Sequence, residues 1–377
     1  RDQAMSVRMS PGRLTAMLVL LAGPVSASAT QSIWSNHAPN VAAQMTGDYR
    51  NASCPKKPPA AYTGHLQLDS KYDQSDASKS RLVARQSKDT ERIRQQVKHY
   101  IGGLVKATQV FQRTRKADEA TTALACLNQW LDAWAGKSAL LSDDASKTGV
   151  ASRKWALAAI ASTLLKVQAL SDQRYQLSAV QARWLGELSA KVMAEYEPRR
   201  YDSGIYFNNH DYWAAWAVAA SGMLVQRDDF IRWADGNLRR GLQQAVRSGD
   251  GSYAYLPLEV ARARLAATYS QYALVPLVLL AESARANGLP WSEHDQQTLE
   301  LLGNFAARTV LDSGPLPELM GQAQTEVAPY KLAWLIPFLY RAPNNRLARQ
   351  LYESEDGNVD NYSQIGGPLK PFYPPLP

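Results

Sequence analysis

The chain has 377 residues, of which 45% are hydrophobic, 20% charged and 9% aromatic. This composition excludes an intrinsically disordered chain and supports one large domain or two smaller ones. The formal net charge of +8 favours an anionic partner. Because zinc-finger and RNA-binding signatures are absent from the sequence, we expect an acidic polysaccharide or an anionic surface and no nucleic acid.

The first 29 residues have the features of a secretory signal peptide. Arg8 and Arg13 precede an apolar run over 14–22, and small residues ending in Ala27-Ser28-Ala29 follow it. The apolar run is too short to span a bilayer. We therefore expect residues 1–29 to be cleaved and the mature protein to be exported without membrane insertion.

Residues 30–77 predict an irregular N-terminal segment, because Pro55, Pro58 and Pro59 interrupt any helix there. From Ser78 onward, apolar residues recur at helical spacing, and the alternation typical of strands is nearly absent. A tail over 355–377, rich in Gly and Pro, is expected to lie along the surface. The expected helices span 78–115, 119–135, 150–170, 177–197, 210–226, 229–247, 260–286, 293–311 and 328–341.

These elements predict an all-α fold. Many helices of medium length with short links favour successive antiparallel hairpins over one four-helix bundle. Such hairpins can curl into an incomplete α/α barrel or toroid, which we expect as a single domain over 78–354.

The mature chain retains two cysteines, Cys54 and Cys126. An even pair in an exported protein favours a disulfide, and two thiolates alone cannot complete a zinc site. The sequence contains no H-E-x-x-H, G-x-S-x-G, Walker A or G-x-G-x-x-G motif, and its five histidines lack metal-ligand spacing. We expect neither a metal nor a cofactor. A pair of Asp or Glu side chains from distant positions, as in glycoside hydrolases, stays open at this point.

The segment 208–216, Asn-Asn-His-Asp-Tyr-Trp-Ala-Ala-Trp, places two amides and an imidazole at the start of an aromatic helix. Asn208 or Asn209 is suited to cap that helix. Two interpretations of His210 remain: a hydrogen-bonded histidine at a helix start, or a catalytic group.

A second segment contains Arg262 and Tyr269, which are seven residues apart. On a continuous helix the two side chains lie on one face, two turns apart. An arginine there can hold a carboxylate and lower the pKa of a neighbouring phenol. The alternative is a surface arginine beside a core tyrosine.

Taken together, these segments resemble the periplasmic alginate lyases of polysaccharide lyase family five, which cleave poly(β-D-mannuronate). The resemblance runs from about residue 52 to 368, in the expected order. It also includes Tyr62-Thr63-Gly64, Ser70-Lys71-Tyr72, Ser75-Asp76, the segments 153–157 (Arg-Lys-Trp-Ala-Leu) and 269–274 (Tyr-Ser-Gln-Tyr-Ala-Leu), and Ile365-Gly366-Gly367.

The resemblance implies an incomplete α/α toroid, a periplasmic location and a groove for uronate chains. It implies that the catalytic residues are Asn209, His210, Arg262 and Tyr269, and it supports the Cys54–Cys126 disulfide. Substrate contacts are expected from Ser70 and Lys71, which belong to a lid, and from Lys147, Thr148 and Tyr269. The loop Ser248–Ser252 is longer than expected, which can alter one wall of the groove.

Uronate lyases remove the proton at C5, next to a carboxylate, and expel the oxygen at C4. Asn209 and Arg262 are expected to stabilise the charge that develops on the carboxylate, and His210 is a further donor if it is protonated. Tyr269 is expected to act as base and then as acid, first as phenolate and then as phenol. His210 is the alternative base, most plausibly for guluronate.

Two other functions stay open at this point. One is a non-catalytic polyuronate-binding subunit of a polysaccharide secretion complex, and the other is a hydrolase of a neutral glycan. Association with the alginate secretion machinery is a further expectation.

Overall fold

The computed structural model describes residues 29–35, 47–201 and 206–376. The predicted signal peptide lies outside the described residues, apart from Ala29. The helices are α2 (Lys88–Arg113), α3 (Ala117–Ala135), α4 (Lys147–Leu170), α5 (Ala179–Tyr196), α6 (Asn209–Val225), α7 (Asp228–Gln243), α8 (Pro257–Val260), α9 (Ala266–Ala286), α10 (Glu293–Leu311), α11 (Leu335–Arg341) and α12 (Arg346–Ser354). The described residues also form six short 3₁₀ helices: η1 (Glu197–Arg200), η2 (Ala263–Leu265), η3 (Pro317–Leu319), η4 (Pro329–Leu332), η5 (Ser363–Ile365) and η6 (Lys370–Phe372).

The expected helices are present, with three corrections. The first helix begins at Lys88 instead of Ser78, because Ser87 caps it and residues 70–83 form a loop with its own hydrogen bonds. The expected helix 260–286 divides into α8, η2 and α9, and 328–341 divides into η4 and α11. The helix α12 and a two-stranded antiparallel hairpin, β1 (Val246–Arg247) with β2 (Ala254–Tyr255), were not expected.

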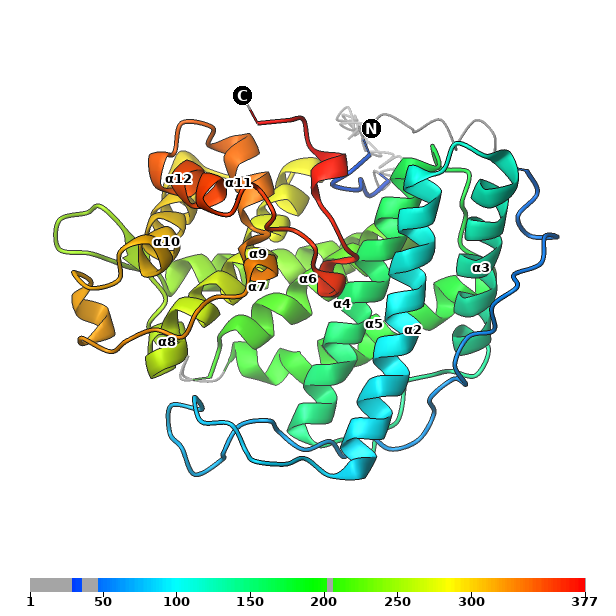
Figure 1. The fold of residues 1–377 in the computed structure, drawn as a ribbon, viewed down its shortest axis with the longest axis horizontal. Helices are drawn as coiled ribbons and strands as arrows, with labels where there is room; N and C mark the ends of the chain where they lie inside the picture. Colours follow the sequence, from blue (N-terminus) through cyan, green and yellow to red (C-terminus); the bar gives the residue numbers. More distant parts are fainter. Residues whose placement is uncertain (1–28, 36–46, 202–205, 377) are drawn as a thin grey trace, which may run out of the picture.

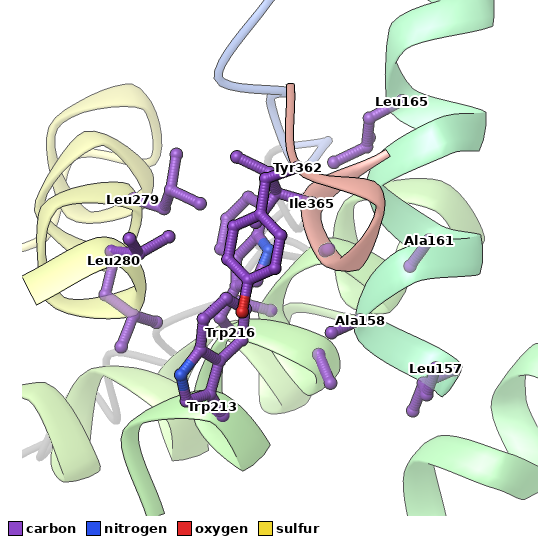
Figure 2. Close-up of a cluster of buried hydrophobic side chains, with 14 of the residues drawn as sticks. Leu157, Ala158, Ala161, Leu165, Trp213, Trp216, Leu279, Leu280, Tyr362 and Ile365 are labelled. Atoms are coloured by element: carbon purple, nitrogen blue, oxygen red, sulfur yellow. The ribbon is translucent and has the colours of Figure 1, made fainter. Parts of the chain in front are cut away.

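Helix α6 is the centre of the fold and packs against α4, α5, α7 and α9 (Figure 1). Its sequence suits that position, because the side chains from Tyr212 to Leu224 are buried all round. Figure 2 shows Trp213 and Trp216 of α6 among apolar side chains from neighbouring segments. Their indole N–H groups donate to the Tyr272 carbonyl and the Ser162 hydroxyl, so the polar atoms of this core are also satisfied.

The tail does not simply lie along the surface, and that expectation is wrong. Tyr362 and Ile365 are buried in the core next to α4 and α6 (Figure 2). Gly366 has a φ of +80°, and a side chain there would meet the α4 backbone at Thr163. Apolar burial therefore holds this part of the tail against the helices.

The predicted disulfide between Cys54 and Cys126 is present and joins the N-terminal coil to α3. Further along the coil, the side chains of Trp130 and Trp134 donate to the carbonyls of Lys56 and Pro59. Among the described residues, one helical stretch, Ala263–Ala286, is long and apolar enough to cross a membrane, but its apolar 18-residue window is 94% buried inside the protein. It forms part of the core.

Candidate active site

Asn209 and His210 are the first two residues of α6. Asn208 is the N-cap, as one of the two sequence-based alternatives predicted, and its side chain accepts from the His210 backbone N–H. The Asp211 carboxylate completes a capping box by accepting from the Asn208 N–H, and Arg199 pairs with it at 2.8 Å. The two candidate residues therefore lie on a firmly held helix end.

Glu259 of α8 holds Asn209 in place, and sequence analysis did not identify it. Its two carboxylate oxygens accept from the backbone N–H of Asn209 at 2.7 Å and from the side-chain Nδ2 at 2.8 Å. Both residues are almost fully buried. Burial raises the pKa of Glu259 to about 7, although the bonds from Asn209 oppose that shift. The Oδ1 atom of Asn209 is buried without a partner among the described residues.

Lys154 of α4 contacts the imidazole of His210. Its Nζ lies 2.5 Å from Nδ1 of the imidazole, and the Trp155 ring stacks on the imidazole at 5.9 Å. Burial lowers the pKa of His210 well below its ordinary value, and the cationic Lys154 lowers it further. Burial also lowers the pKa of Lys154. The neutral imidazole is therefore favoured in this conformation, whereas the sequence-based role of His210 as a further donor was conditional on its protonation.

Arg262 and Tyr269 do contact each other, but the predicted reason is wrong. The continuous helix is absent, because Ala263 has a φ of +54° and η2 separates α8 from α9. The Arg262 guanidinium nevertheless lies 3.7 Å from the centre of the Tyr269 ring. The turn at 261–265 brings the two groups closer than two helical turns would, because an unbroken helix rises 1.5 Å per residue.

Tyr269 is buried, and its hydroxyl lies 2.6 Å from the hydroxyl of Tyr72. Burial raises the pKa of Tyr269 above its ordinary value, and this effect outweighs the lowering by Arg262. Arg262 therefore lowers the pKa of the phenol as predicted, but burial outweighs this effect and the phenol is the favoured form. Tyr72 is a partner that the motif Ser70-Lys71-Tyr72 contained but that was not selected as a site residue.

Residues 70–83, here called the lid, cover this pair. Tyr72 and Leu82 pair as an antiparallel bridge, and the Asp76 carboxylate accepts backbone N–H bonds from Ser80 and Arg81 at the turn. Those bonds lower the pKa of Asp76 well below its ordinary value. In Figure 1 this blue-to-cyan loop runs below α2 toward α8.

Two arginines hold the tip of the lid through its backbone. Arg262 donates to the carbonyls of Ser78 at 3.0 Å and Lys79 at 2.6 Å, and Arg264 donates to that of Ser80. The lid is therefore closed over the candidate site.

The predicted lid residues Ser70 and Lys71 contact Tyr72, whose hydroxyl in turn contacts Tyr269. Ser70 accepts from the backbone N–H of Tyr72, and the exposed Lys71 has its Nζ 5.0 Å from the Tyr72 ring centre. A second lysine, Lys331 of η4, lies 6.0 Å from the centre of the Tyr269 ring. Burial, followed by the charges of Lys71 and Arg262, lowers the pKa of Lys331 to about 8. Sequence analysis missed Lys331, which carries no local motif.

Lys147 and Thr148 begin α4, after the N-cap Ser146. No hydrogen bond or ring contact within the described residues joins either of them to His210 or Tyr269. The loop Ser248–Ser252 is the turn of the β1–β2 hairpin, and Asn304 of α10 donates to its Ser252 carbonyl. Its predicted contribution to a groove wall stays a prediction.

Two cavities lie outside the Arg262–Tyr269 pair. A cavity of about 670 Å³ between α2 and α3 is bordered by Trp130 and Cys126, and one of about 240 Å³ is bordered by Glu259 and Tyr212. Across the ranges that the structure describes, no three His, Cys, Asp or Glu side chains are grouped as a metal site would require.

The sequence is similar to a known protein family. A family model described as alginate lyase matches residues 67–316. The chain is 30% identical over 327 residues to an alginate lyase of Cobetia marina, covering 84% of this chain and 83% of that protein. It is 31% identical over 331 residues to an alginate lyase of Pseudomonas aeruginosa, covering 84% of each chain.

Solved structures of alginate lyase A1-III are similar in fold. The enzyme of Sphingomonas species A1 gives a TM-score of 0.64 at 17% identity, covering 92% of this chain and 98% of that chain. A His-to-Ala variant in complex with a tetrasaccharide gives 0.67 at 19% identity, covering 94% and 99%. The predicted all-α toroid is thereby confirmed. Since the family model spans more than half of the chain and the relatives match most of its length, the chain belongs to the alginate lyase family and is a polysaccharide lyase.

Proposed function

We propose that this alginate lyase cleaves the 1,4-glycosidic bonds of polymannuronate by β-elimination, using Asn209, His210, Arg262 and Tyr269. The observation that carries the proposal is the contact between the Arg262 guanidinium and the Tyr269 ring at 3.7 Å. Arg262 is also close enough to lower the pKa of both His210 and Glu259. One cation therefore connects the candidate proton-transfer group to the helix end that bears Asn209 and His210.

The reaction first requires groups that stabilise negative charge on a uronate carboxylate. Three side-chain nitrogens have hydrogen-bonding capacity left over among the described residues: Asn209 Nδ2, Arg262 Nη1 and His210 Nε2. Glu259 orients the first, and the lid carbonyls hold the guanidinium that carries the second. Donors that are already oriented stabilise developing charge without reorganisation during the reaction.

Tyr269 supplies the proton transfers. Its oxygen takes the C5 proton while its own hydroxyl proton passes to the bridging oxygen at C4. The C5–H and C4–O bonds break, the C4=C5 double bond forms, and the phenol is regenerated. Such a relay suits a tyrosine whose burial favours the protonated form. It also suits mannuronate, in which the C5 hydrogen and the leaving oxygen lie on the same side of the ring.

The substrate is polyanionic, and the cations beside Tyr269 suit it. Lys71, Arg262 and Lys331 lie around the Tyr72 and Tyr269 rings. A uronate carboxylate beside Lys331 would offset the repulsion from Lys71 and Arg262, which contributes to its lowered pKa. Action in the periplasm, after export by residues 1–29, is part of the same proposal, as is association with the alginate secretion machinery.

The test is to incubate the full chain with polymannuronate and, separately, with polyguluronate. We expect ultraviolet absorbance from 4,5-unsaturated ends to rise with polymannuronate and to rise more slowly with polyguluronate. New reducing ends without that absorbance would indicate hydrolysis and overturn the proposal. Faster cleavage of polyguluronate would overturn the specificity alone. Release of the activity by osmotic shock of expressing cells tests the location.

A further inference from the structure

Helix α4 contains two fully buried lysines, Lys154 and Lys166, which make different contacts. Lys166 donates to the carbonyls of Ile365 at 2.6 Å and Gly367 at 2.7 Å. Two backbone acceptors compensate for burying the amine and fasten the C-terminal tail. The role of Lys166 is therefore structural.

Lys154 has no such partners. Its one hydrogen bond among the described residues is the 2.5 Å contact with Nδ1 of His210. The rings of Tyr196 and Trp155 lie 4.9 and 5.0 Å from its Nζ. The nearby carboxylates are engaged elsewhere, since Glu195 pairs with Arg153 and Asp211 with Arg199. An apolar side chain would fill this position at a lower desolvation cost, so the amine requires another explanation.

We propose that Lys154 is a positioning residue that fixes the tautomer of His210, holding Nδ1 as an acceptor so that Nε2 carries the hydrogen. The inference deepens the proposed function and rests on it. In a histidine, the hydrogen bond made by one ring nitrogen decides which nitrogen is protonated. With the Lys154 ammonium on Nδ1, His210 is a neutral donor, and its Nε2 has no lone pair with which to take a proton.

The surroundings of His210 support a neutral imidazole. Lys154 of α4, Arg199 of η1 and Arg262 face it as cations, and all three lower its pKa. Asp211, the next residue of α6, is fully buried and bonded to Arg199, and Glu195 and Tyr196 of α5 lie near Lys154. Two nitrogens 2.5 Å apart can share one proton but cannot both be cationic without strong repulsion.

The fixed tautomer has a consequence for substrate choice. His210 can donate to a substrate carboxylate, but it cannot serve as the base that a guluronate residue requires. Tyr269 is then the only base, and it serves mannuronate. Lys154 is in this sense a specificity-determining residue, although it lies behind His210 and is fully buried.

The decisive variant is Lys154→Met, which keeps the shape of the chain and removes the donor. We expect kcat on polymannuronate at neutral pH to fall about tenfold or more, with KM changed less than about twofold. The pKa of the imidazole should then rise, although burial, Arg199 and Arg262 still hold it below its ordinary value. Because the imidazolium carries a hydrogen on Nε2, the activity of the variant relative to the wild type should be higher below that pKa than above it. The ratio of polyguluronate to polymannuronate cleavage should rise.

Two further variants separate positioning from stability. Lys154→Arg keeps a cationic donor and should restore the wild-type pH profile in part. Lys166→Met is the matched control on the same helix. It should lower the melting temperature but leave the pH dependence of kcat as in the wild type. A Lys154→Met enzyme with the wild-type pH profile and cleavage ratio would overturn the inference.

A spectroscopic measurement keeps the inference testable even if Lys154→Met fails to fold. Nitrogen-15 NMR of the wild-type chain with labelled histidine, assigned with His210→Gln, should show His210 protonated on Nε2 and free of titration between about pH 5 and 8. A protonated Nδ1 would contradict it. The NMR measurement needs no substrate, so it tests the tautomer independently of the cleavage assay. A failure to cleave polymannuronate would overturn only the proposed function.

Discussion

Burial affects the two acidic groups near Arg262 in ways that suit different tasks. The pKa of Tyr269 rises far above neutral pH, so the phenol stays protonated where the enzyme is assayed. The pKa of Glu259 rises to about 7, so the carboxyl changes charge within the working range. Tyr269 is therefore suited to transfer protons, whereas Glu259 is suited to orient Asn209.

The first prediction concerns Tyr269→Phe, which deletes the hydroxyl and keeps the ring. We expect kcat on polymannuronate to fall at least about 100-fold, because general acid–base groups contribute that much or more. Loss of the bond to Tyr72 should cost about 1 kcal/mol of unfolding free energy. Tyr272 lies on the same helix as Tyr269, and its hydroxyl accepts from Gln364. Tyr272→Phe is therefore the matched control and should keep kcat within a few-fold. Steady-state kinetics and thermal melts would measure both, and a folded Tyr269→Phe enzyme with near wild-type kcat would exclude this role.

The second prediction concerns Glu259→Gln and pH. The ionised carboxylate accepts two bonds from Asn209, so kcat/KM of the wild type should rise as the pH passes about 7. Stability should change in the opposite direction: because the folded pKa is raised, the contribution of Glu259 is complete below the unfolded value of about 4.3 and is lost by about pH 7. The loss is of the order of 3 kcal/mol, since each pKa unit corresponds to about 1.4 kcal/mol.

The variant should lose both effects and have lower kcat/KM, because one side-chain N–H would now face Asn209 Nδ2. Melts at pH 5 and 8, together with a pH–rate profile, compare the two proteins. Equal pH dependence of stability in wild type and variant would show that Glu259 does not titrate in this range.

At the residue scale, the sequence predicted the motif residues but not their partners. Asn208 as a cap and the disulfide could be predicted from residue type and cysteine count. The Arg262–Tyr269 contact is present, but its prediction rested on a continuous helix that is absent. Lys154 and Glu259 could not, because they lie 56 and 50 residues from His210 and Asn209. Their pairing depends on how α4 and α8 pack on α6, which local patterns do not contain.

At the scale of elements, the helices were predictable from apolar spacing and the break between α8 and α9 was not. Ala263 adopts a positive φ although it is not a glycine, and no residue in 261–265 is a typical helix breaker. Tertiary bonds maintain the break, because Gln324 donates to the Ala263 carbonyl and the Thr325 N–H donates to that of Arg264. Tertiary bonds also explain why the lid is not helical. Asp76, Arg262 and Arg264 hold residues 78–81 in a turn, although helical periodicity placed these residues in the first helix.

The third prediction concerns the closure of the lid. Arg264→Ala removes one of the bonds to the lid tip and leaves Arg262 in place. A hydrogen bond to a charged group contributes about 1.5 kcal/mol or more, so kcat/KM on polymannuronate should fall about tenfold or more, mainly through KM. Limited proteolysis should cut residues 70–83 faster, while the melting temperature changes little.

Arg81→Ala is the matched control on the lid itself. Arg81 is exposed and pairs with Asp73 at 3.3 Å, a contact of little energetic value in water. Its removal should leave both proteolysis and KM nearly unchanged. If Arg81→Ala and Arg264→Ala raise KM equally, the effect comes from the loss of positive charge and not from the loss of lid closure.

At the scale of the whole molecule, one apolar core joins the N-terminal coil, the helices and the tail. Leu66 of the coil, Trp216 of α6 and Ile365 of the tail belong to the same buried cluster. The all-α class followed from periodicity, and the burial of the tail did not, because a Gly- and Pro-rich sequence is also typical of surface segments. The N-terminal coil carries the lid, so its attachment affects both stability and the site.

The last prediction is that the Cys54–Cys126 disulfide stabilises the fold without being needed for activity. It closes a separation of 72 residues, for which loop entropy gives about 4 kcal/mol. Between Cys54 and the lid, other contacts hold the coil: Trp130 and Trp134 bind its carbonyls, and Leu66 pairs with Ala145. A Cys54→Ser/Cys126→Ser double variant should therefore melt at a lower temperature and unfold at lower urea, yet keep kcat and KM at 25 °C. The single variant Cys54→Ser distinguishes loss of the cross-link from exposure of a free thiol. A double variant that melts like the wild type, or one that folds but loses activity at 25 °C, would show that the disulfide has a different role.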